Sequence, residues 1–258
     1  MRAAAACYLL LMVALPVGIV ARSGFSAGLG GLARALWHPV ARSALLLTLQ
    51  SAAIMALINA VMGTLIAYVL VRYQFPGRRI LNLLIDLPFA IPTLVAGLML
   101  VVLLGPSAPL GRALDGAGLR VVYAPASILL CLLFVTLPFV VRAVEPVLRE
   151  LDPAEEEAAR ILGASDVAAF RRVILPSLSP AIVSGSLLSF SRALGEFGSI
   201  VVVAGNIPRR TLTAAVFVFG EVESGNPLAA SAMALVLITI SFSILLLVDA
   251  FGRRAAHA

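Results

Sequence analysis

Six long apolar runs constrain this chain more than any other feature of its sequence. Each reaches the roughly 17 residues or more that a helix needs to cross the hydrocarbon core of a bilayer. Only 12% of the residues are charged, and the mean hydropathy is +1.07. We therefore predict an all-α membrane protein with about six transmembrane helices, at Ala5–Ala21, Leu45–Val71, Ile80–Leu104, Ala126–Val147, Ala181–Ala204 and Ala229–Phe251.

The first apolar run follows a single basic residue, Arg2, and could be taken for a secretory signal. Because five more runs follow and no small-residue cleavage site ends it cleanly, we expect an uncleaved anchor. Between the first two runs, apolar residues from Leu29 to Trp37 recur at helical spacing and predict an interfacial helix. His38 beside Trp37 fits interface anchoring better than catalysis or metal binding.

Glu156–Pro180 is the longest polar interruption of the apolar pattern. Asp152 can cap a helix that begins at Pro153, with Glu155 completing a capping box, and Gly163 is placed to end it in a left-handed conformation. A second short helix follows, capped by Ser165 or Asp166, and Leu175-Pro176 is expected to stop it. The segment predicts two short helices around a glycine turn, projecting between two spans.

The arginines indicate the orientation of the chain. Eleven lie on the side of the polar loop: Arg2, Arg72, Arg78, Arg79, Arg142, Arg149, Arg160, Arg171, Arg172, Arg253 and Arg254. Seven lie on the opposite side: Arg22, Arg34, Arg42, Arg112, Arg120, Arg209 and Arg210. By the positive-inside rule, the polar loop and both termini are predicted to be cytoplasmic.

Two charges, Arg192 and Glu196, fall inside the fifth apolar run. A charge at membrane depth costs at least ~2.5 kcal/mol, so it points to a function. Four-residue spacing puts the two on one helix face, where they can pair, and Ser191 keeps a neighbouring position small. Either Arg192 gives a translocation pathway a positive character suited to an oxyanion, or the pair is structural. Both readings stay open.

Pro88 and Pro92 stand four residues apart near the start of the third run. They free backbone carbonyls, which a membrane protein tolerates where protein or a water-filled cavity satisfies them. The pair of prolines predicts either a packing kink or a gate beside the pathway.

The polar loop carries a family resemblance. Glu157-Ala158-Ala159, Gly163 and Ile174-Leu175-Pro176 resemble the EAA loop of ABC-importer permeases. In that family the loop contains the coupling helix, which sits in a groove of the ATP-hydrolysing subunit. The resemblance implies that the ATPase-coupling residues are Glu157, Ala158, Ala159, Gly163, Phe170, Leu175 and Pro176.

The resemblance extends over nearly the whole chain, from about Leu45 to Arg254. VRYQFPGRR, LIDLPFAIPTLVAGLML, LSFSRALGEFG, AGNIP and FGRR resemble the T-type permease of sulfate/thiosulfate ABC importers, a family of binding-protein-dependent inner-membrane components. It implies a type I importer fold, with a core domain at 45–254, its EAA loop at 152–180, and an N-terminal span and interfacial segment at 1–44. Related molybdate permeases share several of these elements but usually lack the first span, which favours sulfate.

The implied partners are ABC ATPase subunits, a second permease (a related W-type chain or a second copy), an extracytoplasmic sulfate-binding protein and membrane lipid, in the inner membrane of a bacterial cell. The chain has no lysine, which excludes a G-x-x-x-x-G-K-[ST] phosphate loop, so ATP hydrolysis must come from a partner and the chain is not itself an enzyme. Cys7 and Cys131 lie apart without metal-ligand spacing, and the arginines form no basic stripe. We expect no cofactor, metal site or nucleic-acid partner.

Three alternatives remain. A molybdate or tungstate importer would use the same machinery. An ATPase-independent, proton-coupled secondary transporter would use Glu196 or Asp86 as its proton carrier. A membrane scaffold without transport is disfavoured by the charges inside the spans.

Overall fold

The computed structural model describes residues 1–255, and every regular element in that range is helical. The side chains of residues 2, 3, 5 and 251–255 are outside the description, among them those of Arg2, Arg253 and Arg254. The helices are α1 (Arg2–Leu9), α2 (Leu15–Gly24), α3 (Gly28–Trp37), α4 (Pro39–Arg72), α5 (Arg78–Ala90), α6 (Thr93–Leu104), α7 (Pro109–Gly116), α8 (Pro125–Glu150), α9 (Pro153–Ile161), α10 (Asp166–Ala169), α11 (Leu175–Leu194), α12 (Gly198–Val203), α13 (Ala214–Glu223) and α14 (Pro227–Ala255). Two π-helical turns, at Leu10–Ala14 and Phe170–Ile174, join α1 to α2 and α10 to α11.

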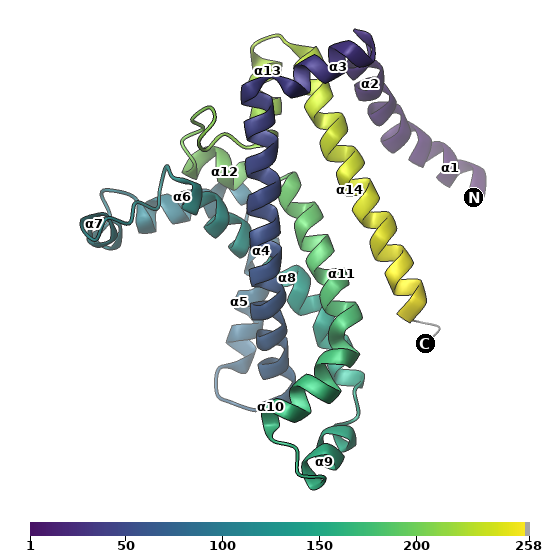
Figure 1. The fold of residues 1–258 in the computed structure, drawn as a ribbon, viewed down its shortest axis with the longest axis vertical. Helices are drawn as coiled ribbons and strands as arrows, with labels where there is room; N and C mark the ends of the chain where they lie inside the picture. Colours follow the sequence, from purple (N-terminus) through teal and green to yellow (C-terminus); the bar gives the residue numbers. More distant parts are fainter. Residues whose placement is uncertain (256–258) are drawn as a thin grey trace.

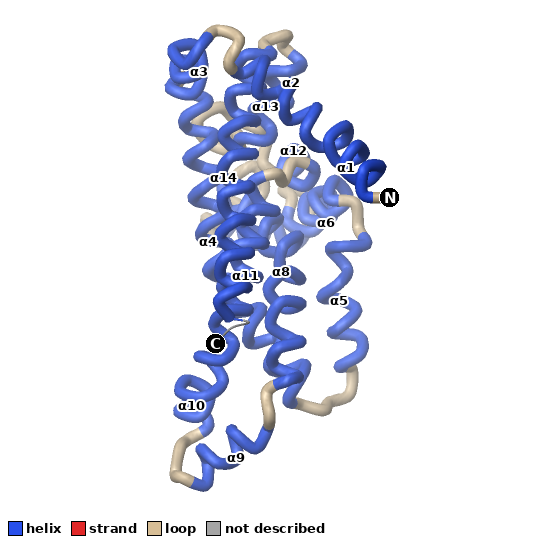
Figure 2. Tube along the Cα trace, turned by 90° about the vertical axis from the view of Figure 1, so that its right-hand side faces the viewer, coloured by secondary structure: helices blue, strands red, loops and turns tan. Residues whose placement is uncertain are grey.

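The centre of the fold is an elongated bundle in which α4, α8 and α11 pack against one another, with α14 alongside α11 (Figure 1). The helices α9 and α10 lie at one end of this bundle, and α3 and α13 lie at the other (Figures 1 and 2). Met55 of α4, Leu132 of α8 and Leu194 of α11 are buried together in the half nearer α13. The half nearer α9 has a second buried cluster, which includes Leu70, Val144 and Leu178. Large apolar side chains elsewhere on these helices are exposed, as expected for surfaces that face lipid.

The predicted spans are confirmed for four of the six runs, with shifted ends. Helices long and apolar enough to cross a membrane occupy Ala6–Gly24, Pro39–Arg72, Pro125–Glu150 and Pro227–Ala250. The predicted interfacial helix is present as α3 and crosses the end of the bundle from which α4 starts (Figure 1).

The prediction for the third run was wrong in one respect, because the run is broken. The helix direction bends by 114° between α5 and α6. Ile91, which precedes Pro92, is extended at φ −90°, ψ 130°, the conformation that a following proline favours. Pro92 then caps α6, and its carbonyl accepts from the amides of Val95 and Ala96. Of the two prolines in this run, Pro88 lies inside α5 and Pro92 ends that helix.

The prediction for the fifth run was wrong at both ends. The helix starts at Asp166, continues through the π-turn and stops at Leu194. Pro176 therefore does not stop the second short helix as expected. The amide of Leu175 donates to the carbonyl of Phe170, five residues back, and this wider turn accommodates the proline that follows.

The two short helices that follow these breaks, α6 and α12, pack against each other. Their backbones touch through glycine. A Cβ atom on Gly97 would lie 2.4 Å from the carbonyl oxygen of Ser199, and one on Gly198 would lie 2.2 Å from Thr93 Oγ1. A Cβ on Gly97 would meet backbone atoms, so this crossing needs glycine there, whereas one on Gly198 would require the Thr93 side chain to move.

We expect Gly97→Ala to destabilise the protein, because the added methyl group must push α6 away from α12 and overpacking costs about 1–3 kcal/mol. Thermal unfolding in detergent would measure the loss as a lower midpoint. Gly116→Ala is the matched control, since a Cβ there meets no atom within 4 Å. Equal midpoints for the two variants would contradict the close crossing.

Candidate functional site

The turn between α9 and α10 is the most projecting part of the chain at its end of the bundle (Figures 1 and 2). The predicted capping residues of its helices are confirmed, although among the described hydrogen bonds none from the Glu155 side chain completes the capping box. Asp152 Oδ1 accepts from the amide of Ala154 at 2.9 Å, and Pro153 is the first residue of α9. Gly163 has φ +87°, and Ser165, rather than Asp166, caps α10 by accepting from Ala168 at 3.3 Å. The turn is thus a short, well-capped structure and not a loose loop.

The tip of this turn exposes apolar side chains. Ile161 is 85% exposed, Leu162 88% and Val167 68%. An open cavity of about 530 Å³ lies beside them, lined by Ala159, Leu162, Gly163, Ala164, Ser165, Ala168, Ala169, Arg172 and Val173. Neighbouring apolar residues that are both exposed and rigidly held are typical of a contact surface for another protein.

A buried ion pair fixes α9 to the end of α4. Glu156 Oε1 lies 2.5 Å from Arg72 Nη2, and both side chains are largely buried. Arg72 also donates to the carbonyl oxygen of Leu151 at 3.3 Å. This pair was not predicted from the sequence, because its members are far apart in the chain and no local pattern links them.

The residues that the sequence assigned to coupling divide into two groups. Glu157, Ala158 and Gly163 are exposed, and so are Leu175 and Pro176 in the first turn of α11, while Ala159 is half-buried. Phe170 instead turns toward α4, where its ring meets that of Tyr68 edge-on with centroids 5.3 Å apart. Phe170 therefore holds the turn against the bundle rather than presenting a contact surface.

Arg192 and Glu196 form the expected ion pair, at 2.9 Å between Arg192 Nη2 and Glu196 Oε2. The prediction that they share one helix face was wrong, because Arg192 is in the last turn of α11 and Glu196 follows the end of that helix. Glu196 is 1% exposed, and its Oε1 accepts from both the amide and the hydroxyl of Ser199 at 3.0 Å. The Glu196 carboxylate therefore joins the end of α11 to the start of α12. Ser191, which directly precedes Arg192 in α11, is half-buried.

A second charge cluster, at the α5–α8 contact, was not foreseen. Arg142 of α8 binds both carboxylate oxygens of Asp86, at 2.8 and 2.5 Å, and also contacts Asn82 and Glu145. Glu145 in turn pairs with Arg149 at 2.5 Å. The sequence signal for this cluster was the presence of opposite charges within two of the apolar runs.

The two prolines of the third run lie in different surroundings. Pro88 is buried inside α5, two residues after Asp86. Pro92 lies at the break, where α6 begins beside α12.

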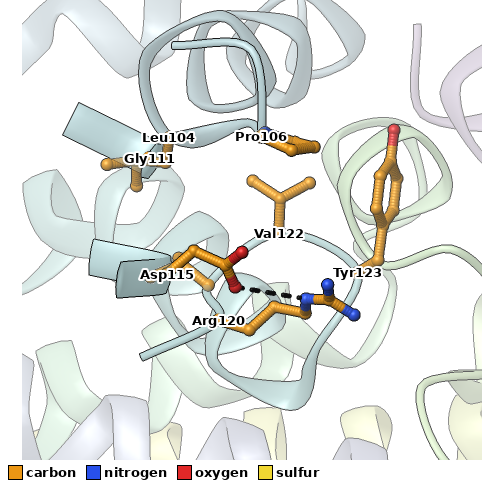
Figure 3. A pocket seen from close by; sticks show the side chains of 8 residues that line it. Leu104, Pro106, Gly111, Asp115, Arg120, Val122 and Tyr123 are labelled. Carbon is orange, nitrogen blue, oxygen red and sulfur yellow. Dashed lines mark ion pairs between the residues drawn. The ribbon is translucent and has the colours of Figure 1, made fainter. Parts of the chain in front are cut away.

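A pocket of about 160 Å³ lies in the segment between α6 and α8 (Figure 3). An ion pair between Asp115 and Arg120, at 3.6 Å, borders it. Tyr123 donates its amide to the carbonyl of Val203 at 2.9 Å, which anchors this segment to the end of α12. None of the predicted site residues lines this pocket.

Comparison with known proteins agrees on the type of molecule. The family described as "Binding-protein-dependent transport system inner membrane component" matches residues 59–257. The sulfate transport system permease protein CysT of Synechocystis sp. is 42% identical over 253 residues, covering 97% of this chain and 88% of the relative. CysT of Salmonella typhimurium is 44% identical over 221 residues, which cover 84% of this chain and 80% of the relative. A probable CysT of Nephroselmis olivacea is 43% identical over 242 residues, covering 94% and 85%.

Solved structures show the same fold at low sequence identity. A chain of a bacterial alginate ABC transporter, in complex with an alginate-bound periplasmic protein, superimposes with a TM-score of 0.80 at 16% identity, covering 98% of this chain and 93% of its own. A chain of the MetNI methionine ABC transporter gives a TM-score of 0.60 at 19% identity, and the match covers 87% of this chain and 95% of that one. The type of fold predicted from the sequence, that of ABC-importer permeases, is confirmed.

We expect Glu156→Gln to destabilise the protein by about 3 kcal/mol, because it leaves the Arg72 charge buried without its partner. The thermal unfolding midpoint would fall, and the exposed neighbour Glu155→Gln serves as control. The charge reversal Arg72→Glu with Glu156→Arg should recover part of the loss. A midpoint unchanged by Glu156→Gln would show that the pair does not hold α9.

Proposed function

The chain belongs to the binding-protein-dependent transport system inner membrane components, and on that premise we propose that it is the permease subunit of an ABC importer that takes up sulfate. Support for sulfate comes from relatives at 42–44% identity that are named sulfate permeases. The observation that carries the mechanism is the α9–α10 turn, which is capped, apolar at its tip and tied to α4 through Arg72 and Glu156.

In this proposal the turn docks into a groove of an ABC ATPase subunit. Ile161, Leu162 and Val167 bury their exposed apolar surface there, and Glu157 lies at the edge of the contact. Binding and hydrolysis of ATP by the partner displace α9. Because Glu156 is paired with Arg72, the displacement reaches α4 and the helices α8 and α11 that pack on it. The bundle then alternates between inward-open and outward-open states.

The proposed assembly contains two permease chains, two ATPase subunits and an extracytoplasmic binding protein that delivers the anion. The second permease is either a related W-type chain or a second copy. Residues 45–254 form the transport core and 1–44 an added anchor. The proposed location is a bacterial inner membrane with both termini cytoplasmic. For the C-terminal side this is supported by α14, which runs from the end that carries α13 toward the end that carries α9 (Figure 1).

For the pathway, we propose that Arg192 acts on the passing anion while Glu196 fixes its position. The Arg192 side chain remains 35% exposed despite its ion pair, so its free donors can reach a sulfate oxygen. In this proposal Ser191, beside Arg192, and Pro92, at the break near α12, also border the pathway. Pro88 is buried inside α5, so in this proposal it acts through the packing of that helix rather than by contact with the anion.

The proton-coupled alternative is disfavoured by the ion pairs. Asp86 is bound by Arg142 and Glu196 by Arg192, whereas proton coupling usually uses buried carboxylates without a fixed counter-ion. A molybdate importer would differ only in the anion delivered and accepted.

We expect Glu157→Lys and Gly163→Pro to leave the protein inserted in the membrane but to abolish ATP-driven uptake. Lysine reverses a charge at the docking surface, and proline cannot adopt the positive φ of residue 163. Uptake by vesicles and co-purification of the ATPase would both be measured, with the exposed Glu150→Lys as control. Wild-type uptake in both variants would refute docking through this turn.

The substrate is tested with vesicles that contain the complete transporter. Uptake of radiolabelled sulfate should saturate and should persist in the presence of trace molybdate, because the relatives are sulfate permeases. Uptake of molybdate in preference to sulfate would keep the mechanism and replace the substrate.

A further inference from the structure

An open cavity of about 520 Å³ lies where α4 begins, at the end of the bundle opposite α9 (Figure 1). One wall is the first three turns of α4, with Arg42, Ser43 and Gln50. The other is the segment between α12 and α13, with Arg209 and Arg210, and Trp37 closes the rim. None of the predicted site residues lines this cavity.

The cavity carries a positive charge that is not neutralised. Arg42, Arg209 and Arg210 all line it, and among the described residues no carboxylate lies within ion-pair distance of any of them. The Arg42 guanidinium instead lies 5.9 Å from the centre of the Trp37 ring. The arginines of the charge clusters described above, in contrast, are each paired with an acidic side chain.

The segment that carries two of these arginines is held by internal hydrogen bonds and is locally strained. Arg209 has φ +63°, which is uncommon for a residue with a side chain and costs energy unless the surroundings enforce it. They do so here, because the Ile207 carbonyl accepts from the amides of Arg210, Thr211 and Leu212. The hydroxyl of Thr211, fully buried, accepts from the amide of Ile207 at 3.0 Å. A simple surface loop needs no such bracing.

We propose that Arg42, Arg209 and Arg210 form a binding site for a tetrahedral oxyanion, supplied either by free sulfate or by the phosphate of a lipid headgroup. Planar guanidinium groups offer paired donors that match such oxygens, and Ser43 and Gln50 add neutral donors. The sulfate source rests on the proposed function, in which the site collects the anion before the pathway. The lipid source fits Trp37 and the exposed Leu46 below it, where the apolar length of α4 begins.

The site is open and its arginines are exposed, so binding is expected to be weak, rapidly reversible and sensitive to salt. These are the properties of a site that attracts an anion and releases it. A tight site would retain its ligand and slow transport.

The test uses the permease–ATPase complex without the binding protein, in neutral detergent at low ionic strength. The variant is Arg209→Gln with Arg210→Gln. Arg34→Gln is the control, because Arg34 is exposed on the neighbouring α3 and lies outside this cavity. Equilibrium binding of radiolabelled sulfate is measured on lipid-free complex, and native mass spectrometry counts the phosphatidylglycerol molecules retained after lipid is added.

We expect the double variant to lose one of the two ligands, and the control neither. Sulfate binding weakened about ten-fold, as expected for the loss of charge-assisted hydrogen bonds, supports the site with free anion as ligand. Retention of one phosphatidylglycerol fewer, with sulfate binding unchanged, supports it with a headgroup as ligand. No change in either measurement, or an equal change in Arg34→Gln, would overturn the proposal.

This test separates the site from the proposed function. If the wild-type transporter takes up sulfate on ATP hydrolysis while the double variant binds both ligands normally, only the oxyanion site fails. If the wild-type takes up no sulfate but the variant loses its phospholipid, the proposed substrate fails and the site stands.

Discussion

In hydrocarbon, every backbone amide and carbonyl must be paired within the protein, and the fold depends on this constraint. Long helices meet it without help. Where two of the apolar runs break, after α5 and after α11, other parts of the chain meet it. At the second break the Glu196 carboxylate accepts from the amide of Ser199 at the start of α12, and beyond the two breaks α6 and α12 pack closely through Gly97 and Gly198. Each break is therefore held against protein and not left to lipid.

Several charged side chains within and at the ends of the apolar runs are also paired within the protein. Their ion pairs connect different helices rather than stabilise single ones. Arg142 and Asp86 join α8 to α5, Arg192 and Glu196 join α11 to α12, and Arg72 and Glu156 join α4 to α9. A buried ion pair adds little net stability but penalises separation of its partners strongly. Such pairs suit helices that must move together, and the α4–α9 pair links the proposed ATPase contact directly to a span.

The sequence predicted much of this structure because apolar length and helix caps act locally. The six runs, the caps at Asp152 and Ser165, and the left-handed Gly163 all follow from neighbouring residues. The breaks were mislocated because proline has two outcomes: Pro92 ends a helix, while a π-turn lets Pro176 remain inside one. The pairing of Arg72 with Glu156 and the inward turn of Phe170 depend on tertiary packing, and no local pattern encodes them.

The energy source of uptake is the most direct test of the account. Vesicles containing the complete transporter would be given either ATP with the proton gradient collapsed, or an imposed proton gradient without ATP. The account predicts sulfate uptake in the first condition, because the partner ATPase supplies the energy. It predicts none in the second, because the Glu196 and Asp86 carboxylates are bound by arginine. Uptake driven by the proton gradient alone would contradict it.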